Sequence, residues 1–346
     1  MPALGAPVSG TYLTTGAEQA IGQREDLSDV ISRIDPVEVP FFSNARKEGQ
    51  TNILNEWQEQ LLDAVDNTAQ PEGFDALFVD PVQTTRPGNY AQILARTWIV
   101  SGTLDVVDKA GRDRESTYQK MLKGLEVKRD LESTLLKNIA KSGTDPRVLA
   151  GFPAWMVNGD FGSGGLAAPS SGDGVTAAVI DTAKAMTFEI FDKVLEDCYN
   201  SGGAPTLMLM TPNAKRQFSG LNDASDALPA QNRYVRSTPG KTAFIGSVSL
   251  YVSDFGDLEI AIDRFAEGSS ALGGSVEDSN GSPAPYESVY ILDKRFFAVT
   301  ALAGRAFLSE PLAKTGDATK GQILYEGTLK VSAHLAHGFV AASTIA

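Results

Sequence analysis

Two histidines near the C-terminal end of the chain are the first candidates for chemistry. His334 and His337 stand three residues apart. On a helix this spacing would put both imidazoles on one face, where they could ligate a metal ion. On a strand an odd spacing puts them on opposite faces. The apolar and polar residues around them alternate, which predicts a strand, so we expect neither a metal nor a catalytic role for this pair.

A lone thiol and two glycine clusters are the next candidates. Cys198 is the only cysteine of the chain and falls on the apolar face of a predicted helix, which favours a buried structural thiol over a nucleophile. The glycine clusters at 161–165 and 272–274 resemble phosphate-binding loops, but neither is followed by the Lys-Ser or Lys-Thr pair of such loops. We expect both clusters to be linkers.

Pairs of carboxylates, which can work as general acid and base, also occur. Glu25 adjoins Asp26, and Glu56 lies three residues before Glu59. Such pairs arise by chance in a chain with 43 acidic residues. We therefore predict that the chain is not an enzyme and binds no cofactor or metal. The alternative that stays open is a soluble α+β enzyme with a site in residues 187–320.

The bulk composition excludes several classes of protein. The chain has 346 residues, a formal net charge of −13 and a hydrophobic fraction of 42%. Its negative charge repels the phosphates of nucleic acid, so we expect weak or no specific binding to DNA. No apolar run approaches the roughly 18 residues of a transmembrane helix, and the N-terminal segment lacks the features of a secretory signal. A single cysteine rules out an intramolecular disulfide and fits a reducing compartment such as the cytoplasm.

The longest predicted element is a helix over about residues 110–141. The stretch 108–142 contains no proline and is rich in Lys, Arg, Glu, Leu and Met, which are strong helix formers. At about 1.5 Å per residue it would measure roughly 45 Å, far longer than an average helix. Its apolar residues form an interrupted stripe, which is not the seam of a coiled coil. A long, charged helix of this kind is typical of a strut, so the sequence indicates a mechanical role.

Two extended segments precede this helix. Residues 1–49 form an arm in which proline recurs, with one short helical candidate at Gln23–Ser32. Its backbone is extended because the residue before a proline avoids helical angles. Residues 50–100 form a long β-hairpin loop, whose outgoing strand includes Trp57 and whose returning strand covers residues 90–100. A two-stranded ribbon is barely stable alone in water, so this loop needs a partner.

A mixed domain follows the helix. Residues 188–319 alternate short strands and helices, which places them in the α+β class. The remaining residues, 320–346, close the chain, and the alternation over 322–342 predicts one half-buried strand. The predicted elements of the mixed domain are two helices at Phe188–Asn200 and 212–220, four strands at Thr206–Met210, Val248–Ser253, Leu258–Ile262 and Ser288–Leu292, and a loop at Glu267–Pro285.

A series of short segments carries a resemblance to a known family. In chain order they are Pro40-Phe41-Phe42, Asn55-Glu56-Trp57-Gln58, Glu72-Gly73, Val100-Ser101-Gly102-Thr103, Ala110-Gly111-Arg112 with Glu115, Glu126–Glu132, and Leu149-Ala150-Gly151-Phe152. Together with the order of the larger parts, this series resembles the major capsid proteins of tailed bacteriophages with the Hong Kong 97-like fold. Within that fold it is similar to one capsid-protein family once catalogued as a domain of unknown function. The matches cover about residues 36–155, and the rest of the chain is similar only in architecture.

The resemblance implies an α+β, Hong Kong 97-like capsid fold with five parts. The axial domain of such a fold gathers around the fivefold and sixfold axes of a shell. The implied parts are an N-terminal arm (1–49), an extended β-hairpin loop (50–100), a peripheral domain with the spine helix (101–187), an axial domain (188–319) and a return strand of the peripheral domain (320–346).

The resemblance also implies a function. It is that of a structural subunit that self-assembles, as pentamers and hexamers, into the icosahedral shell of a phage enclosing double-stranded DNA. The implied partners are further copies of the chain, a portal and, because the chain starts almost at once with the arm, a separate scaffolding protein; no membrane is involved. The implied location is the virion, with assembly in the host cytoplasm. Because an arm and a hairpin cannot bury their own apolar residues, Phe41, Phe42 and Trp57 are expected to pack against other subunits or the body of the spine helix, with ordinary packing within the chain as the alternative. Trp98 is expected to take part in intersubunit or arm and loop packing.

Overall fold

The computed structural model describes residues 31–343 except 66, 67, 77, 79, 164–166, 182, 222–235, 239, 240, 244–248 and 267–285. Several features named from the sequence lie outside the described residues. They are the Glu25-Asp26 pair, most of the helical candidate at Gln23–Ser32, part of the glycine cluster at 161–165, the whole cluster at 272–274 and the loop at Glu267–Pro285.

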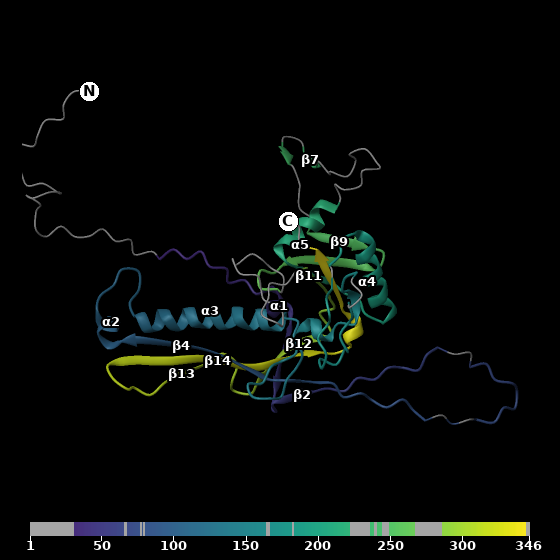
Figure 1. Ribbon diagram of the computed structural model, residues 1–346, viewed down its shortest axis with the longest axis horizontal. Coiled ribbons are helices and arrows are strands. Elements are labelled where there is room, and N and C mark those ends of the chain that lie inside the picture. Colours follow the sequence, from purple (N-terminus) through teal and green to yellow (C-terminus); the bar gives the residue numbers. More distant parts are fainter. Residues whose placement is uncertain are drawn as a thin grey trace, which may run out of the picture.

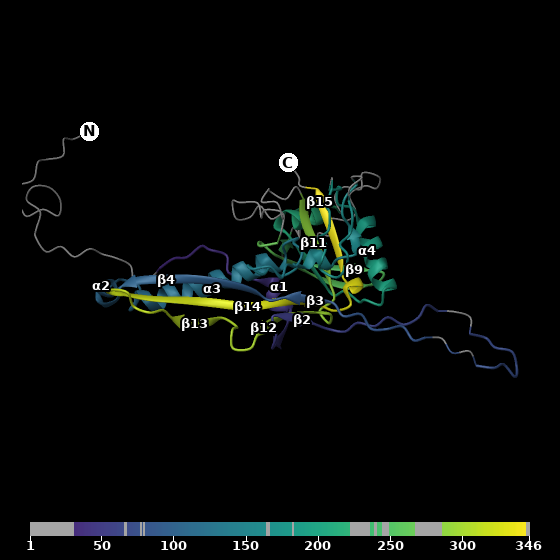
Figure 2. The ribbon, with the colours of Figure 1, turned by 60° about the horizontal axis from the view of Figure 1, so that its bottom comes forward.

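A long sheet and one helix build the elongated half of the molecule (Figures 1 and 2). The central strand is β14 (Ala318–Val331). On one side, all ten residues of β4 (Gln92–Ser101) pair antiparallel with Ala318–Gly327 of β14. On the other side, β12 (Phe297–Leu302) and β13 (Leu308–Pro311) pair with successive parts of β14. The sheet is extended by β1 (Arg46–Gln50), which runs parallel to β12.

The spine helix is α3 (Glu115–Leu135), which lies along β4 and β14 (Figure 2). It buries Val127, Leu131 and Leu135 completely or nearly so. With 21 residues it is about 31 Å long. The predicted helix over 110–141 was therefore too long at both ends.

Tertiary contacts set both ends of α3. At its start, Asp105 of the short helix α2 (Gly102–Val106) accepts hydrogen bonds from the N–H and the hydroxyl of Ser116, each at 3.0 Å. Between the two helices the chain turns at Gly111, whose φ of 77° favours glycine. At the other end, the hydroxyl of Tyr290 donates to the carbonyl of Leu136 at 2.9 Å. Helix propensity encodes neither contact, which is why the sequence overestimated the length.

A six-stranded sheet with two helices forms the other half of the molecule (Figure 1). Its helices are α4 (Phe188–Asn200) and α5 (Pro212–Gly220), and hydroxyls of the preceding threonines cap both N-termini. These two helices confirm the sequence-based prediction. The strands, in their order across the sheet, are β5 (Asn158–Asp160), β15 (Gly338–Ser343), β11 (Tyr286–Leu292), β6 (Leu207–Met210), β10 (Gly256–Ile262) and β9 (Leu250–Ser253).

The C-terminal segment forms two strands, so the prediction of a single strand over 322–342 was wrong. The first, β14, belongs to the long sheet, and the second, β15, belongs to the six-stranded sheet. Between them Ala333 has a left-handed φ of 50°, and η3 (His334–Ala336) forms one 3-10 turn. The alternation of apolar and polar residues continues past Val331, but the pairing with β12 ends there, at Phe297. The chain is therefore free to cross from one sheet to the other.

The returning strand of the predicted hairpin is also divided. The hairpin proper consists of β2 (Leu54–Glu56) and β3 (Gly88–Tyr90). Beyond β3 the chain leaves its partner and continues as β4 in the long sheet. Ala91 marks the break: it is fully buried, and its N–H donates to the carbonyl of Ile53 at 2.7 Å.

Short elements complete the described chain. The arm enters the body at α1 (Pro40–Asn44), and the 3-10 helix η1 (Phe152–Trp155) contributes four buried residues to the core. A small ribbon pairs β7 (Arg236–Thr238) with β8 (Lys241–Ala243). None of the described helices is long and apolar enough to cross a membrane.

Candidate functional site: the distal loop, its base and the spine helix

A long excursion leaves the body through the hairpin of β2 and β3. Beyond these strands, Trp57 N–H donates to the carbonyl of Pro87 at 3.1 Å, and Glu59 and Thr85 exchange backbone hydrogen bonds of 3.0 and 2.8 Å. We name residues 60–84, which follow, the distal loop. It points away from the body, and the α2 end of the spine helix lies at the opposite end of the molecule (Figures 1 and 2).

Asn89 fastens the base of this excursion to the core. Its side chain is fully buried. The side-chain amide donates to the carbonyls of Ala150 at 3.1 Å and Leu329 at 2.9 Å, and its oxygen accepts the N–H of Ala150 at 2.8 Å. One side chain thus ties β3 both to the segment before η1 and to β14. No pattern in the sequence singled out Asn89.

Glu59 ties the base to the turn between β14 and β15. Its carboxylate accepts hydrogen bonds from the indole N–H of Trp57 at 2.8 Å and the backbone N–H of Ala333 at 3.0 Å, and lies 3.6 Å from Nδ1 of His334. Burial opposes the charged form, but the contacts with His334, Trp57 and Ala333 outweigh it and lower the pKa of Glu59. The charged carboxylate is therefore the form that holds the base in place.

The distal loop exposes large apolar side chains together with acidic ones. Leu62, Val65 and Phe78 are 96%, 104% and 97% exposed. Isolated exposed apolar residues are ordinary, but a series on one projecting segment marks an interaction surface. Among the described residues of the loop, the exposed large apolar ones are Leu61, Leu62, Val65, Phe74, Phe78 and Val82, and the acidic ones are Asp63, Glu72, Asp75 and Asp80.

The two arm phenylalanines lie in different surroundings. Phe41 is fully buried, with its ring 5.1 Å from that of Phe297 and 5.4 Å from that of Phe152. Phe41 therefore packs against η1 and β12 of its own chain, which is the intrachain alternative to a contact with another subunit or with the body of the spine helix. Phe42 is half-buried, with its ring 6.0 Å from that of Phe307. A contact of Phe42 with a neighbouring subunit stays a prediction.

The two tryptophans differ in the same way. Trp57 is 8% exposed, and its ring lies 5.3 Å from that of Trp155. It belongs to the same core cluster as Phe41, so it needs no neighbour for its burial. Trp98 is half-buried on β4, across from Gly321 of β14, where any added Cβ would come within 2.6 Å of the indole. Its contact with a neighbour also stays a prediction.

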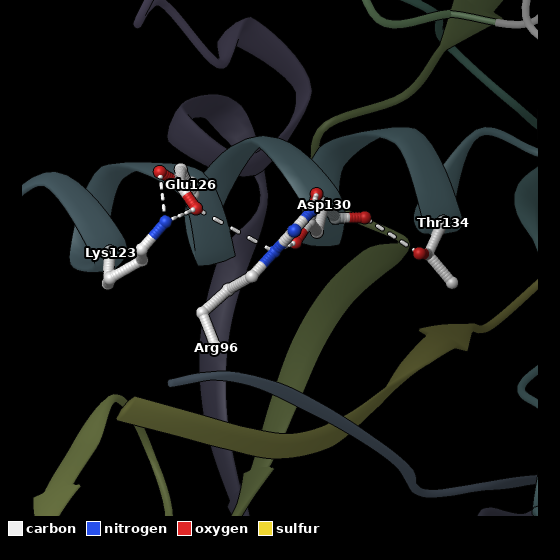
Figure 3. Close-up of polar contacts among 5 residues, drawn as sticks. All are labelled: Arg96, Lys123, Glu126, Asp130 and Thr134. Atoms are coloured by element: carbon white, nitrogen blue, oxygen red, sulfur yellow. Dashed lines mark hydrogen bonds and ion pairs between the residues drawn. The ribbon is translucent and has the colours of Figure 1, made fainter. Parts of the chain in front are cut away.

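Ion pairs neutralise the acidic residues on one face of the spine helix (Figure 3). Arg96 of β4 donates to both carboxylate oxygens of Asp130, at 2.6 and 2.9 Å, and lies 3.9 Å from Glu126. The hydrogen bonds that Arg96 donates to Asp130, and the negative charge of that carboxylate, raise the pKa of Arg96. On the helix itself, Lys123 donates to Glu126 at 2.8 Å, and the hydroxyl of Thr134 donates to the carbonyl of Asp130 at 2.7 Å.

Two lysines of the spine helix remain without a carboxylate partner in the part of the chain that the structure describes. Lys120 and Lys128 are both exposed, and neither forms a salt bridge there. The outer surface of α3 is therefore basic, although the helix carries as many acidic as basic residues. The distal loop and this surface have opposite charge and lie on opposite sides of the molecule's centre.

Comparison with known proteins decides the family. Residues 9–344 match the family model described as SU10 major capsid protein. The chain belongs to this family. It is also 30% identical over 239 residues to the major capsid protein of Escherichia phage Phieco32. This match covers 58% of this chain and 67% of the relative. The chain is thus a structural, shell-forming subunit of a tailed phage and a component of the virion, and it associates with its own copies.

Solved capsid structures share the fold of this family member. The match to Gordonia phage Cozz covers 99% of this chain and 98% of that chain, with a TM-score of 0.58 and 11% identity. The match to the capsid structure of cyanophage P-SCSP1u covers 98% of this chain and 100% of that chain, with a TM-score of 0.57 and 11% identity. The match to the capsid of a native GTA particle covers 95% of this chain and 97% of that chain, with a TM-score of 0.58 and 12% identity. These matches show the Hong Kong 97-like α+β fold that the resemblance implied.

The residues that the sequence offered as candidates for chemistry are His334, His337 and Cys198. His337 is fully buried with its ring 5.2 Å from that of Phe152, and burial lowers its pKa to about 4. Both histidines lie at the turn between two sheets and not on the strand that was predicted. Burial raises the pKa of Cys198 to about 12, so its thiol stays protonated. Within the described ranges, no three His, Cys, Asp or Glu residues form a group that could hold a metal ion.

Proposed function

We propose that this shell subunit joins its neighbours by placing its distal loop on the spine-helix surface of another copy. The observation that carries the proposal is the exposure of Leu62, Val65 and Phe78 on a segment whose base is fixed by buried hydrogen bonds. A rigid base presents the loop in one direction, so ordering it on a neighbour costs less conformational entropy.

Apolar burial supplies the attraction in this contact. Each fully buried Leu, Val or Phe side chain contributes about 1.5–3 kcal/mol relative to the exposed state. The three most exposed side chains would together contribute roughly 5–9 kcal/mol before the cost of association. A subunit that makes such a contact with several neighbours is held by all of them at once.

Charge favours the spine helix as the receiving surface. The distal loop carries four described acidic residues, whereas Lys120 and Lys128 lie exposed and without carboxylate partners on α3 of the described chain. The loop points away from its own spine helix (Figure 2), so the contact requires a second molecule. This makes it a heterologous contact, which can close into rings and shells.

The same proposal extends to the organisation of the shell. The subunits form pentamers and hexamers, with residues 188–319 as the axial domain around the symmetry axes. The peripheral domain consists of residues 101–187 and 320–346, and the arm (1–49) and the extended loop (50–100) reach between subunits. Assembly takes place in the host cytoplasm with a portal and a separate scaffolding protein. The net charge of −13 supports weak binding to the enclosed double-stranded DNA, and the family assignment supports a chain without enzymatic activity.

Electron microscopy of loop variants tests the proposal. The double variant Leu62→Ser, Phe78→Ser should fold as the wild type does, judged by circular dichroism, but should form no closed particles. The control Gln83→Ser changes an exposed polar residue of the same loop and should assemble normally. Lys128→Glu should weaken assembly by charge repulsion, with partial recovery in high salt. Normal particles from both the double variant and Lys128→Glu would refute the contact.

A further inference from the structure

The outermost strand of the six-stranded sheet has a free edge. Among the described strands, β9 pairs with β10 and with no other. The N–H of Ile260 donates to the carbonyl of Ser249 at 3.1 Å, so the peptide groups of Ser249 point towards β10. Because peptide groups along a strand point to alternate sides, those of Leu250 and Val252 point away from β10. These two residues can therefore exchange backbone hydrogen bonds with a further strand.

The same two residues expose apolar side chains. Leu250 is 52% exposed and Val252 is 67% exposed. Their side chains share one face of the sheet, and Tyr251 between them points to the other face, where it packs against the core cluster of α4 and α5. A free backbone edge that also carries exposed apolar side chains is typical of a strand to which another chain adds.

Other outer strands of the two large sheets have features that discourage such pairing. The features are three charged residues in β1 (Arg46, Lys47 and Glu48), the proline that ends β13 (Pro311), the Arg96 of β4 that is bound to α3, and a bridge beside β5 between Gly162 and Asp181. The sequence of β9, Leu-Tyr-Val-Ser, contains neither a charge nor a proline. Its edge is therefore open to a further strand.

The ribbon of β7 and β8 is a second element without a partner. These strands pair with each other and with no other described strand, and the ribbon projects beyond the six-stranded sheet (Figure 1). A two-stranded ribbon is only marginally stable alone in water. The sequence over 231–249 contains three basic residues and no acidic one, and the basic residues are Arg233, Arg236 and Lys241.

The surroundings of the β9 edge are acidic. Asp257 and Glu259 of β10 lie directly opposite the two outward residues of β9, Asp254 follows the strand, and all three are exposed. Lys294 lies 3.2 Å from Glu259, whereas Asp254 and Asp257 form no salt bridge within the described chain. Like charges on adjoining strands repel, which disfavours pairing between two β9 strands and favours a basic partner.

We propose that the β7–β8 ribbon of one subunit pairs with the β9 edge of a second copy and extends its six-stranded sheet. Backbone hydrogen bonds to Leu250 and Val252 supply the attraction, and charge selects the ribbon as the partner. Each subunit has one ribbon and one edge, so the contact is heterologous and can repeat around a ring. It is separate from the contact proposed for the distal loop and does not depend on it.

Pairing within one chain is the alternative that a test must separate. Six residues lie between the end of β8 and the start of β9, which is enough for the loop of a hairpin. In the structure, however, the ribbon and β9 belong to different sheets. The experiment therefore has to distinguish a bond between two chains from a bond within one.

Disulfide trapping in assembled particles of the full chain makes this distinction. Two variants combine Val252→Cys on β9 with a cysteine at the middle of either ribbon strand, Ser237→Cys or Thr242→Cys, and are oxidised after assembly. At least one variant should give a ladder of covalent oligomers on a denaturing gel, which collapses to monomer on reduction. The three single variants and the wild type, whose Cys198 is buried, should run as monomers.

Charge reversal is a second measurement that needs no cysteine. Asp254→Lys combined with Asp257→Lys should lower the yield of particles about tenfold or more, and so should Arg236→Glu combined with Lys241→Glu. A chain that carries all four changes has opposite charges again and should recover most of the yield. A merely structural effect of either pair would not be repaired by the other pair.

Three results of the trapping experiment would overturn the proposal. They are monomers alone from both double variants, a disulfide that forms only within single chains, and a ladder from Val252→Cys by itself, which would indicate pairing between two β9 strands. If the cysteine variants form no particles, the charge series decides. A fourfold variant that assembles no better than either pair then excludes the ribbon as the partner of β9.

Discussion

The replacement Phe41→Ala separates a core role of the arm from an assembly role. The sequence placed this residue on an extended arm that reaches neighbours. In the structure its ring is fully buried between Phe152 and Phe297 of the same chain. Its loss therefore acts on the stability of the single subunit, before any assembly takes place.

The magnitude follows from the burial. Truncating a fully buried Phe to Ala typically costs about 3–5 kcal/mol, because transfer free energy is lost and a cavity remains. The two neighbouring rings place Phe41 towards the upper half of that range, since each favourable ring pair adds about 0.5–1.5 kcal/mol. Phe42 is half-buried and lies 3.8 Å from the Lys47 ammonium, so Phe42→Ala should cost only about 1–2 kcal/mol.

Urea unfolding of the dissociated subunit, followed by circular dichroism, measures both costs. Phe41→Ala should shift the midpoint to markedly lower urea with an unchanged slope, and Phe42→Ala should shift it by less than half as much. The reasoning is refuted if Phe41→Ala changes the free energy of unfolding by less than about 1 kcal/mol and yet abolishes particles. That outcome would place the ring at a contact between subunits.

Three further predictions test other parts of the structure. Burial lowers the pKa of His337 to about 4 from 6.5, so the unfolded chain gains the proton before the folded chain does as the pH falls. The resulting contribution to the free energy of unfolding, about 3 kcal/mol, is present above pH 6.5 and lost towards pH 4. In urea unfolding measured over this range, His337→Asn should flatten the dependence of the free energy of unfolding on pH. A Cβ at Gly151 would overlap the carbonyl oxygen of Lys137, so Gly151→Ala should prevent soluble expression or lower the melting temperature sharply, and an unchanged melting temperature would contradict the packing. Glu326 contacts Arg147 at 2.8 Å with its side chain 6% exposed, so Glu326→Gln should destabilise by about 1–3 kcal/mol, and an unaltered urea midpoint would argue against the pair.

The sequence by itself determined those helices and strands whose ends depend on residues close by in the chain. Thr187 and Thr211 are capping residues next to apolar helical patterns, and α4 and α5 begin where these residues predict. The strand β6 was also predicted from local sequence, because its residues form an unbroken apolar run, and all four of them are buried in the structure. The family resemblance rests on the same kind of local signal, since short segments in a fixed order carry it.

Tertiary structure alone decided the ends of the spine helix, the split of the C-terminal strand and the burial of Phe41 in α1. Each depends on a partner far away in sequence: Tyr290 for the end of α3, β12 for the end of β14, and Glu132, whose carboxylate accepts the N–H of Phe41, for α1. The same holds for the burial of Glu132 on α3 and of Asp263 after β10, which lie 131 positions apart in the sequence. Burial raises the pKa of both carboxyl groups, and burial exists only once the chain has folded.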